Sequence, residues 1–228
     1  MSIDIFSQHP ASPWYSARGA ELLVGGVSVS ELAARVGRTP FYAYDRAVID
    51  AQVQALRGAL PREVQLHYAM KANPMPDVVR HVARLVDGLD VASGRELQTA
   101  LTTGIRPHDI SFAGPGKNVE EMQQAVQAGI VINVESPREL RELVAIGRAQ
   151  GRRPRLCIRV NPDFELKSSG MKMGGGPKQF GIDAEVVPEV LQSMRDLPVD
   201  FLGFHIFSGS QNLRPESIVD SQQKAQIG

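Results

Sequence analysis

Residues 65–74 read Gln-Leu-His-Tyr-Ala-Met-Lys-Ala-Asn-Pro, and the interpretation of the whole chain starts from them. The first half is apolar and short, which is typical of a buried strand. Lys71 follows where that strand should end, and Asn73-Pro74 then breaks the extended run. Burial favours a neutral lysine, and a neutral amine can attack a carbonyl and form a Schiff base. The segment alone also fits a lysine whose amine reaches solvent.

Downstream of this stretch, predicted strands and predicted helices alternate six times. The predicted strands are 65–69, 88–92, 109–113, 130–134, 155–160 and 199–207. The first helix is expected to begin near Pro76 and the last near Pro215. Three helices in between begin with a polar residue followed three positions later by glutamate, a pattern that satisfies unpaired amides at a helix start. These pairs are Ser93 with Glu96, Asn118 with Glu121, and Ser136 with Glu139.

Alternating strands and helices require a parallel sheet, because each helix returns the chain to the same end of the sheet. A doubly wound sheet would place a glycine-rich phosphate turn after its first strand, but residues 71–74 contain no glycine. A (β/α)8 barrel instead places functional residues at the ends of several strands. Lys71, Asp90, Arg159 and residues 205–211 occupy such positions. We therefore predict an α/β fold of the TIM-barrel type.

The number of units predicts an incomplete barrel. A closed barrel has eight strands, usually in about 250 residues. This chain of 228 residues supplies about six of the eight units after residue 64. We therefore expect an N-terminal fragment of a longer protein. The alternative, an open half-barrel as the natural product, would expose long apolar strand edges.

The N-terminal residues are expected to form a separate part. Residues 21–29 predict a hairpin that turns at a Gly-Gly pair, and residues 39–44 predict a second extended segment. Ser30 is expected to cap a short helix, and Asp45 a longer one over 46–60. Because the strands lack partners before the barrel, we assign residues 1–44 to a β-domain and residues 45–228 to the partial barrel.

Composition excludes several functional classes. The 25 basic and 25 acidic side chains are interleaved, which argues against binding to nucleic acid or to a membrane surface. A single cysteine, Cys157, excludes an internal disulfide framework and a cysteine-based metal site. No apolar stretch approaches transmembrane length, and the N-terminus lacks a signal pattern. We therefore expect a soluble cytoplasmic protein.

The candidate site residues follow predicted strands. Gly209 and Ser210 can offer amides and a hydroxyl to a phosphate. Asp90 and Arg159 each also fit a structural ion pair, and His205 alone fits a core histidine. No second histidine or acid stands at metal-ligand spacing, so no metal is predicted. A Schiff-base lysine and a phosphate site at one barrel mouth suggest pyridoxal 5'-phosphate.

Six motifs follow one another along the chain, and together they carry a resemblance to a known family. They are residues 68–73, 90–97, 112–117, 159–162, 178–181 and 203–211. They resemble the fold-type III pyridoxal-phosphate decarboxylases, the family of diaminopimelate, ornithine and lysine decarboxylases, and most closely its diaminopimelate branch. Residues 171–176, within a glycine-rich loop predicted to contact substrate, resemble an exosortase-associated subgroup.

The resemblance implies that Lys71 holds the cofactor as a Schiff base, that Gly209 and Ser210 contact its phosphate, and that Asp90 and Arg159 lie near its ring. It implies decarboxylation of diaminopimelate or another basic amino acid by a homodimer. Further family ligands would lie beyond Gly228, so the chain alone is expected to be inactive. An amino-acid racemase on the same barrel, and a non-catalytic pyridoxal-phosphate-binding or regulatory homologue, remain the alternatives.

One position departs from the family pattern. The family often has a second histidine two residues after the first, and that histidine stacks on the cofactor ring. After His205 this position holds Phe207. Phenylalanine can stack through its face but cannot donate a proton. The resemblance therefore keeps His205 and Phe207 as cofactor contacts and leaves the tuning of the proton transfer open.

Overall fold

The computed structural model describes residues 14–162, 171–172, 179–207, 209–210 and 214–227, without the side chains at 171, 172, 210 and 225–227. It divides into two compact units, Met1–Val64 and Gln65–Gly228. The boundary predicted at 44/45 lies before helix α2 (Arg46–Ala59), whereas this division lies after it. The assignment of residues 1–44 to a β-domain stays a prediction.

The first unit contains the predicted hairpin. Strands β1 (Ala17–Arg18), β2 (Glu21–Val24) and β3 (Val27–Ser28) form an antiparallel sheet in that order. The hairpin turns at Gly25 and Gly26, whose φ angles of 59° and 77° favour glycine. Residues 39–44, predicted to be extended, form no strand in the described part of the chain.

The helices of the first unit begin at polar caps. Helix α1 (Val29–Val36) is capped by Ser28, whose hydroxyl accepts the amide of Glu31, and not by Ser30 as predicted. Ser28 has a glutamate three residues later and Ser30 does not, which favours the earlier cap. Helix α2 begins as predicted, because the Asp45 carboxylate accepts the amide of Ala47 at 2.9 Å.

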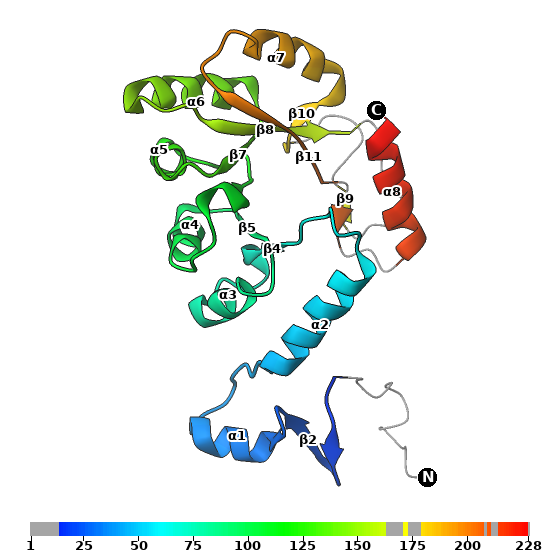
Figure 1. Ribbon diagram of the computed structural model, residues 1–228. Helices are drawn as coiled ribbons and strands as arrows, with labels where there is room; N and C mark the ends of the chain where they lie inside the picture. The colour runs from blue at the N-terminus through cyan, green and yellow to red at the C-terminus, as the bar shows by residue number, and fades with distance from the viewer. Residues whose placement is uncertain (1–13, 163–170, 173–178, 208, 211–213, 228) are drawn as a thin grey trace. The chain divides into compact units, whose positions relative to one another are not determined.

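The second unit contains a parallel sheet with the predicted alternation (Figure 1). Its six main strands are β4 (His67–Ala69), β5 (Gly88–Val91), β6 (Ile110–Phe112), β7 (Val131–Val134), β8 (Arg155–Asn161) and β11 (Asp200–Ile206). Each is followed by a helix, and these helices are α3 (Pro76–Val82), α4 (Gly94–Leu101), α5 (Val119–Ala128), α6 (Pro137–Gln150), α7 (Val187–Met194) and α8 (Pro215–Ile227). The predicted partial barrel of six units is confirmed within the described residues.

Neighbouring strands along the chain are also neighbours in the sheet. Strands β4 to β8 pair in parallel in chain order, and β11 pairs in parallel with β8. In Figure 1, helices α3 to α6 follow one another in an arc outside these strands. Parallel strands share one end of the sheet, so the residues that follow them gather there.

The helix starts are fixed by the predicted pairs. Asn118 and Glu121 form a complete capping box at α5. At α4 the carboxylate of Glu96 accepts the amide of Ala92, one residue before the cap. At α6 the carboxylate of Glu139 likewise accepts the amide of Glu135 at 2.6 Å. These bonds tie the end of a strand to the first turn of the following helix.

The core lies between the strands and their helices. Strand residues such as Leu89, Ile132 and Ile158 are fully buried, as are helix residues such as Leu97 and Leu143. Each large aliphatic side chain buried in this way contributes about 1.5–3 kcal/mol.

Strand β11 is the exception to this burial. It pairs only with β8 among the described residues, and its Phe201, Leu202 and Phe204 are 41%, 47% and 51% exposed. In the described part of the chain, β11 therefore presents an exposed apolar edge.

The long loop between β8 and α7 is described only in part. The two-residue strand β9 (Met171–Lys172) pairs with β12 (Gly209–Ser210), and β10 (Ile182–Asp183) pairs with β8. None of these three strands was predicted. Residues 163–170 and 173–178 of the glycine-rich loop, which include positions 173–176 of the exosortase-type run, lie outside the described residues.

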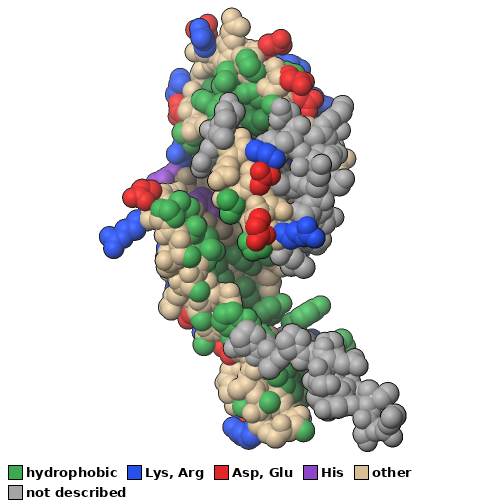
Figure 2. Space-filling view, turned by 90° about the vertical axis from the view of Figure 1, so that its right-hand side faces the viewer, with side chains coloured by type: hydrophobic (Ala, Val, Ile, Leu, Met, Phe, Trp, Pro, Cys, Tyr) green, Lys and Arg blue, Asp and Glu red, His purple; other side chains and the backbone are tan. Residues whose placement is uncertain are grey.

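Charge is distributed as the sequence predicts. Figure 2 shows basic and acidic side chains interspersed with hydrophobic ones on the face in view. None of the helices in the described part of the chain combines the length and the apolar character needed to cross a bilayer.

Candidate active site

The ends of the parallel strands surround a cavity of about 570 Å³. Of the seven predicted site residues, five line it. They are Lys71, Asp90, Arg159, His205 and Phe207. The structure therefore brings together side chains that are distant in the sequence, because they follow strands that end at the same edge.

Lys71 lies in a 3-10 turn, Met70–Ala72, directly after β4. The turn is held where the Tyr68 hydroxyl donates to the carbonyl of Asn73 at 3.1 Å. The Lys71 Nζ lies 5.1 Å from the ring centroid of Phe207, within the range of a cation–π contact. Lys71 is exposed in this structure, so the desolvated position expected from the sequence is not realised among the described residues.

Asp90 is held by two neighbours. The Ser111 hydroxyl donates to its Oδ1, and Nδ1 of His67 lies 3.4 Å from the same oxygen. Burial acts to raise the pKa of Asp90, but the hydrogen bonds from His67 and Ser111 outweigh it and lower the pKa. The hydrogen bond to Asp90 raises the pKa of His67, against the opposing effect of burial. Asp90 therefore keeps its negative charge at the cavity wall.

Arg159 is both a cavity residue and one half of a buried ion pair. Its Nη1 lies 2.8 Å from Oε1 and 3.1 Å from Oε2 of Glu135. The two side chains are 8% and 2% exposed. The guanidinium also lies 4.9 Å from the ring centroid of Phe180 and 5.8 Å from that of Phe207. Arg159 can therefore form a structural ion pair and also line the cavity, the two roles that the sequence suggested.

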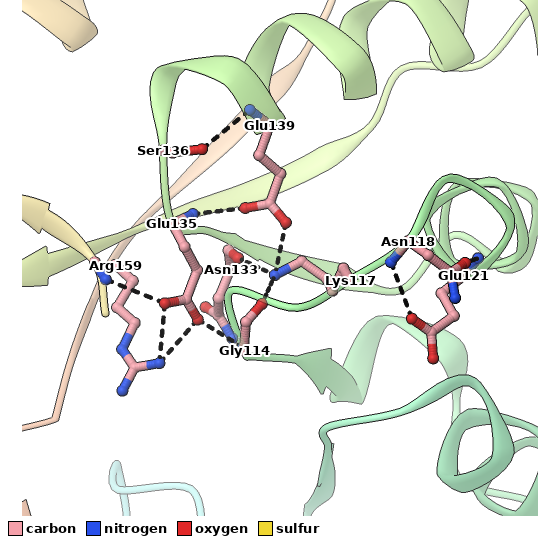
Figure 3. A network of polar contacts seen from close by, with 10 residues as sticks. Gly114, Lys117, Asn118, Glu121, Asn133, Glu135, Ser136, Glu139 and Arg159 are labelled. Carbon is pink, nitrogen blue, oxygen red and sulfur yellow. Dashed lines mark hydrogen bonds and ion pairs between the residues drawn. The ribbon is translucent and has the colours of Figure 1, made fainter. Parts of the chain in front are cut away.

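Glu135 and Lys117 extend this ion pair into a network (Figure 3). Glu135 also accepts the amides of Gly114 at 2.6 Å and Gly181 at 3.1 Å. The Lys117 Nζ donates to the carbonyls of Gly114 and Asn133, at 2.6 and 3.0 Å. Gly114, which lines the cavity, is therefore held through both its amide and its carbonyl.

The network contains residues that sequence reasoning missed. Glu135 directly follows β7, so the strand-end pattern that selected Asp90 and Arg159 also applies to it. Glu139 was predicted only as a helix cap, but its Oε1 also lies 2.8 Å from the Lys117 Nζ. Burial raises the pKa of Glu139, and the charge of Lys117 opposes that effect.

His205 has an unused polar atom at this site. Its Nδ1 is buried and has no hydrogen-bond partner among the described residues. Burial and then the charge of Arg159 lower the pKa of His205, while the charges of Asp90 and Glu135 oppose them. A neutral histidine with an unpartnered buried nitrogen is an observation that points to a polar ligand.

The two residues predicted to bind phosphate lie in a short strand that the sequence did not predict. Gly209 and Ser210 form β12, and their backbone lies opposite Lys172 and Met171 of β9. The Ser210 side chain lies outside the described residues. Contact of these two residues with a phosphate stays a prediction. Among the described residues, no three His, Cys, Asp or Glu side chains are grouped so that they could hold a metal.

Comparison with known proteins gives a consistent result. Residues 46–227 match the family model described as "Pyridoxal-dependent decarboxylase, pyridoxal binding domain". The chain is 37% identical over 205 residues to a diaminopimelate decarboxylase from Aquifex aeolicus. The matched region covers 89% of this chain and 48% of that relative. It is 36% identical over 187 residues to the L-glutamyl-[BtrI acyl-carrier protein] decarboxylase from Niallia circulans, at 81% and 44% coverage.

Solved structures are similar as well. The crystal structure of diaminopimelate decarboxylase from Helicobacter pylori complexed with L-lysine has a TM-score of 0.77 and 32% identity, covering 86% of this chain and 51% of that one. The chain spans about half the length of the curated relatives that it matches.

Proposed function

Because this chain belongs to the pyridoxal-dependent decarboxylases, we propose that the full-length protein removes the carboxylate of an amino acid with Lys71 as the cofactor-bearing residue. The observation that carries the proposal is the shared cavity. Lys71, Asp90 and Arg159 belong to three different strand ends and line the same 570 Å³ space. A cavity of that size is in the range for a small cofactor and its substrate.

The residues of the cavity fit pyridoxal phosphate. Phe207 offers an aromatic face to a flat ring, and Arg159 offers a positive charge to an anionic oxygen. Nδ1 of His205 is buried and without a partner among the described residues, so a ligand atom can satisfy it. Gly209 and Ser210 are proposed to contact the phosphate, and Lys71 the aldehyde carbon. When bound, pyridoxal phosphate supplies an electron sink for the bond pair that the departing carboxylate leaves behind.

The chain's own residues then have distinct tasks. The Lys71 amine is the nucleophile at the cavity wall. Asp90, held anionic by His67 and Ser111, supplies a negative charge at the cavity wall, and Arg159 supplies a positive one. Phe207 cannot carry a proton, so the proton that replaces the carboxylate must come from another group. We assign the delivery of this proton to the Lys71 Nζ, which lies 5.1 Å from the centroid of the Phe207 ring.

The proposed substrate follows from the substrates for which the matched proteins are named. Two matched proteins are named for diaminopimelate and for an L-glutamyl group on an acyl-carrier protein. We propose diaminopimelate or another basic amino acid, decarboxylated by a homodimer in the cytoplasm. Light scattering of the full-length protein tests the dimer.

The test of this function is release of CO2 by the full-length protein loaded with pyridoxal phosphate. The substrates are diaminopimelate, lysine, ornithine, arginine and L-glutamyl acyl-carrier protein. CO2 from one of the basic amino acids supports the proposal. Loss of optical activity without CO2 identifies a racemase instead, and cofactor binding without either reaction identifies a non-catalytic homologue.

A further inference from the structure

Glu135 joins three segments of the chain next to the cavity. Its buried carboxylate contacts Arg159 of β8, Gly114 of the loop after β6, and Gly181, which directly precedes β10. These are three segments that approach the cavity from different strands. One carboxylate therefore fixes the relative position of all three.

The contact with Arg159 is the one with chemical consequence. An arginine side chain is long and flexible, so a buried partner is needed to give its guanidinium one orientation. In Figure 3, Nη1 of Arg159 is turned toward Glu135. The same guanidinium lies 4.9 and 5.8 Å from the ring centroids of Phe180 and Phe207. Glu135 thus sets where the positive charge of Arg159 meets the cavity.

We propose that Glu135 is a positioning residue that acts through Arg159, by holding its guanidinium at the cavity wall and by balancing its charge. The inference rests on the proposed function, because it takes Arg159 to face bound pyridoxal phosphate. A merely structural Glu135 would instead act through the amides of Gly114 and Gly181, whatever residue stands at position 159. The two roles therefore differ in how substitutions at positions 135 and 159 combine.

The experiment is a double-mutant cycle on the full-length protein. The cofactor is removed, and the affinity for added pyridoxal phosphate is measured by absorbance titration. The variants are Glu135→Gln, Arg159→Met and the double variant. The matched control is Glu142→Gln on α6, whose carboxylate pairs with Arg138 at the surface. Glutamine keeps the size of Glu135 and one acceptor oxygen but removes the charge. Gly114 and Gly181 donate to different oxygens of Glu135, so one of these two bonds is lost as well, whichever residue stands at position 159.

We expect Glu135→Gln to weaken cofactor binding at least tenfold in the wild-type background and less than threefold when Arg159 is already Met. Glu142→Gln should leave affinity unchanged. Equal losses in both backgrounds would overturn the inference while leaving the proposed function intact. If the unsubstituted protein binds no pyridoxal phosphate, the proposed function itself fails.

Folding gives a second measurement if Glu135→Gln alone is unfolded. An unpaired buried guanidinium is strongly destabilising, and removing it relieves that cost. The double variant should then regain the circular-dichroism signature of the folded protein. A double variant that stays unfolded would show that Glu135 acts through other contacts, against the inference.

Discussion

The Lys117 Nζ lies 2.8 Å from Oε1 of Glu139, and these two side chains are only 1% and 9% exposed. Few lysines are so completely buried, and this one also donates to two backbone carbonyls, of Gly114 and Asn133. Since Gly114 lines the cavity, the pair stabilises the fold and the cavity wall at once.

Replacement of Lys117 by methionine should therefore be costly. It leaves the carboxylate of Glu139 buried without its charge partner, and we expect a loss of about 3–5 kcal/mol in unfolding free energy. Urea unfolding of the full-length protein measures it. The control is Arg138→Gln, which breaks the exposed pair with Glu142 and should cost at most about 1 kcal/mol. A Lys117→Met variant as stable as that control would show that the buried pair contributes nothing.

The pair of His67 and Asp90 predicts a dependence of stability on pH. The folded pKa of His67 is raised above its ordinary value of 6.5, so its stabilising effect is complete below that value and is lost as pH rises through the folded pKa. The pKa of Asp90 is lowered, so its contribution is present above the unfolded pKa and is lost as pH falls through the folded one.

His67→Gln should therefore destabilise the protein more at about pH 5.5 than at about pH 8.5, since only the protonated histidine gains from Asp90. The difference should not exceed about 1 kcal/mol, because the Asp90 carboxylate is partly exposed. Thermal unfolding at both pH values measures it. In an Asp90→Asn background the pH dependence should be much smaller, because Asp109 and Asp87 raise the pKa of His67 less than Asp90 does. A dependence of undiminished size there would have another origin.

The alternation of strands and helices in the second unit could be predicted from the sequence because each element carries its own signals. Apolar runs set the strands, and polar caps such as Asn118 set the helix starts to within a residue or two. The pairs β9–β12 and β8–β10 escaped prediction, because two-residue strands are too short to show a period. The predicted cap of α1, Ser30, is wrong by two residues: the pattern of a serine three residues before a glutamate marks Ser28, which precedes Glu31.

The candidate site was predictable only at the level of strand ends. That pattern selected Asp90 and Arg159, and applied consistently it would have selected Glu135. The contact between His67 and Asp90 depends on the register of β4 against β5, where Ala69 lies opposite Asp90, and register is not visible in one sequence. Lys71 follows the end of the strand as predicted, but it is exposed whereas Met70 of the same 3-10 turn is buried, and this difference within one turn has no signal in the sequence.

Phe207 predicts a specific effect on proton transfer. Phe207→His introduces a group that titrates near pH 6.5, so turnover should acquire a pH dependence in that region while cofactor affinity changes little. The steady-state rate as a function of pH measures it. Phe207→Leu, which removes the aromatic face, should instead weaken cofactor binding. If Phe207→Leu binds the cofactor as tightly as the unsubstituted protein, the ring does not stack on it.

The most direct measurement concerns which lysine carries the cofactor. The full-length protein loaded with pyridoxal phosphate is reduced with borohydride, digested and mapped by mass spectrometry. We predict the label on the peptide that contains Lys71, whose amine lies at the cavity wall. We predict none on Lys117, whose buried amine is held by Glu139 and two carbonyls. A label on Lys117 or any other lysine, with Lys71 unmodified, would contradict it.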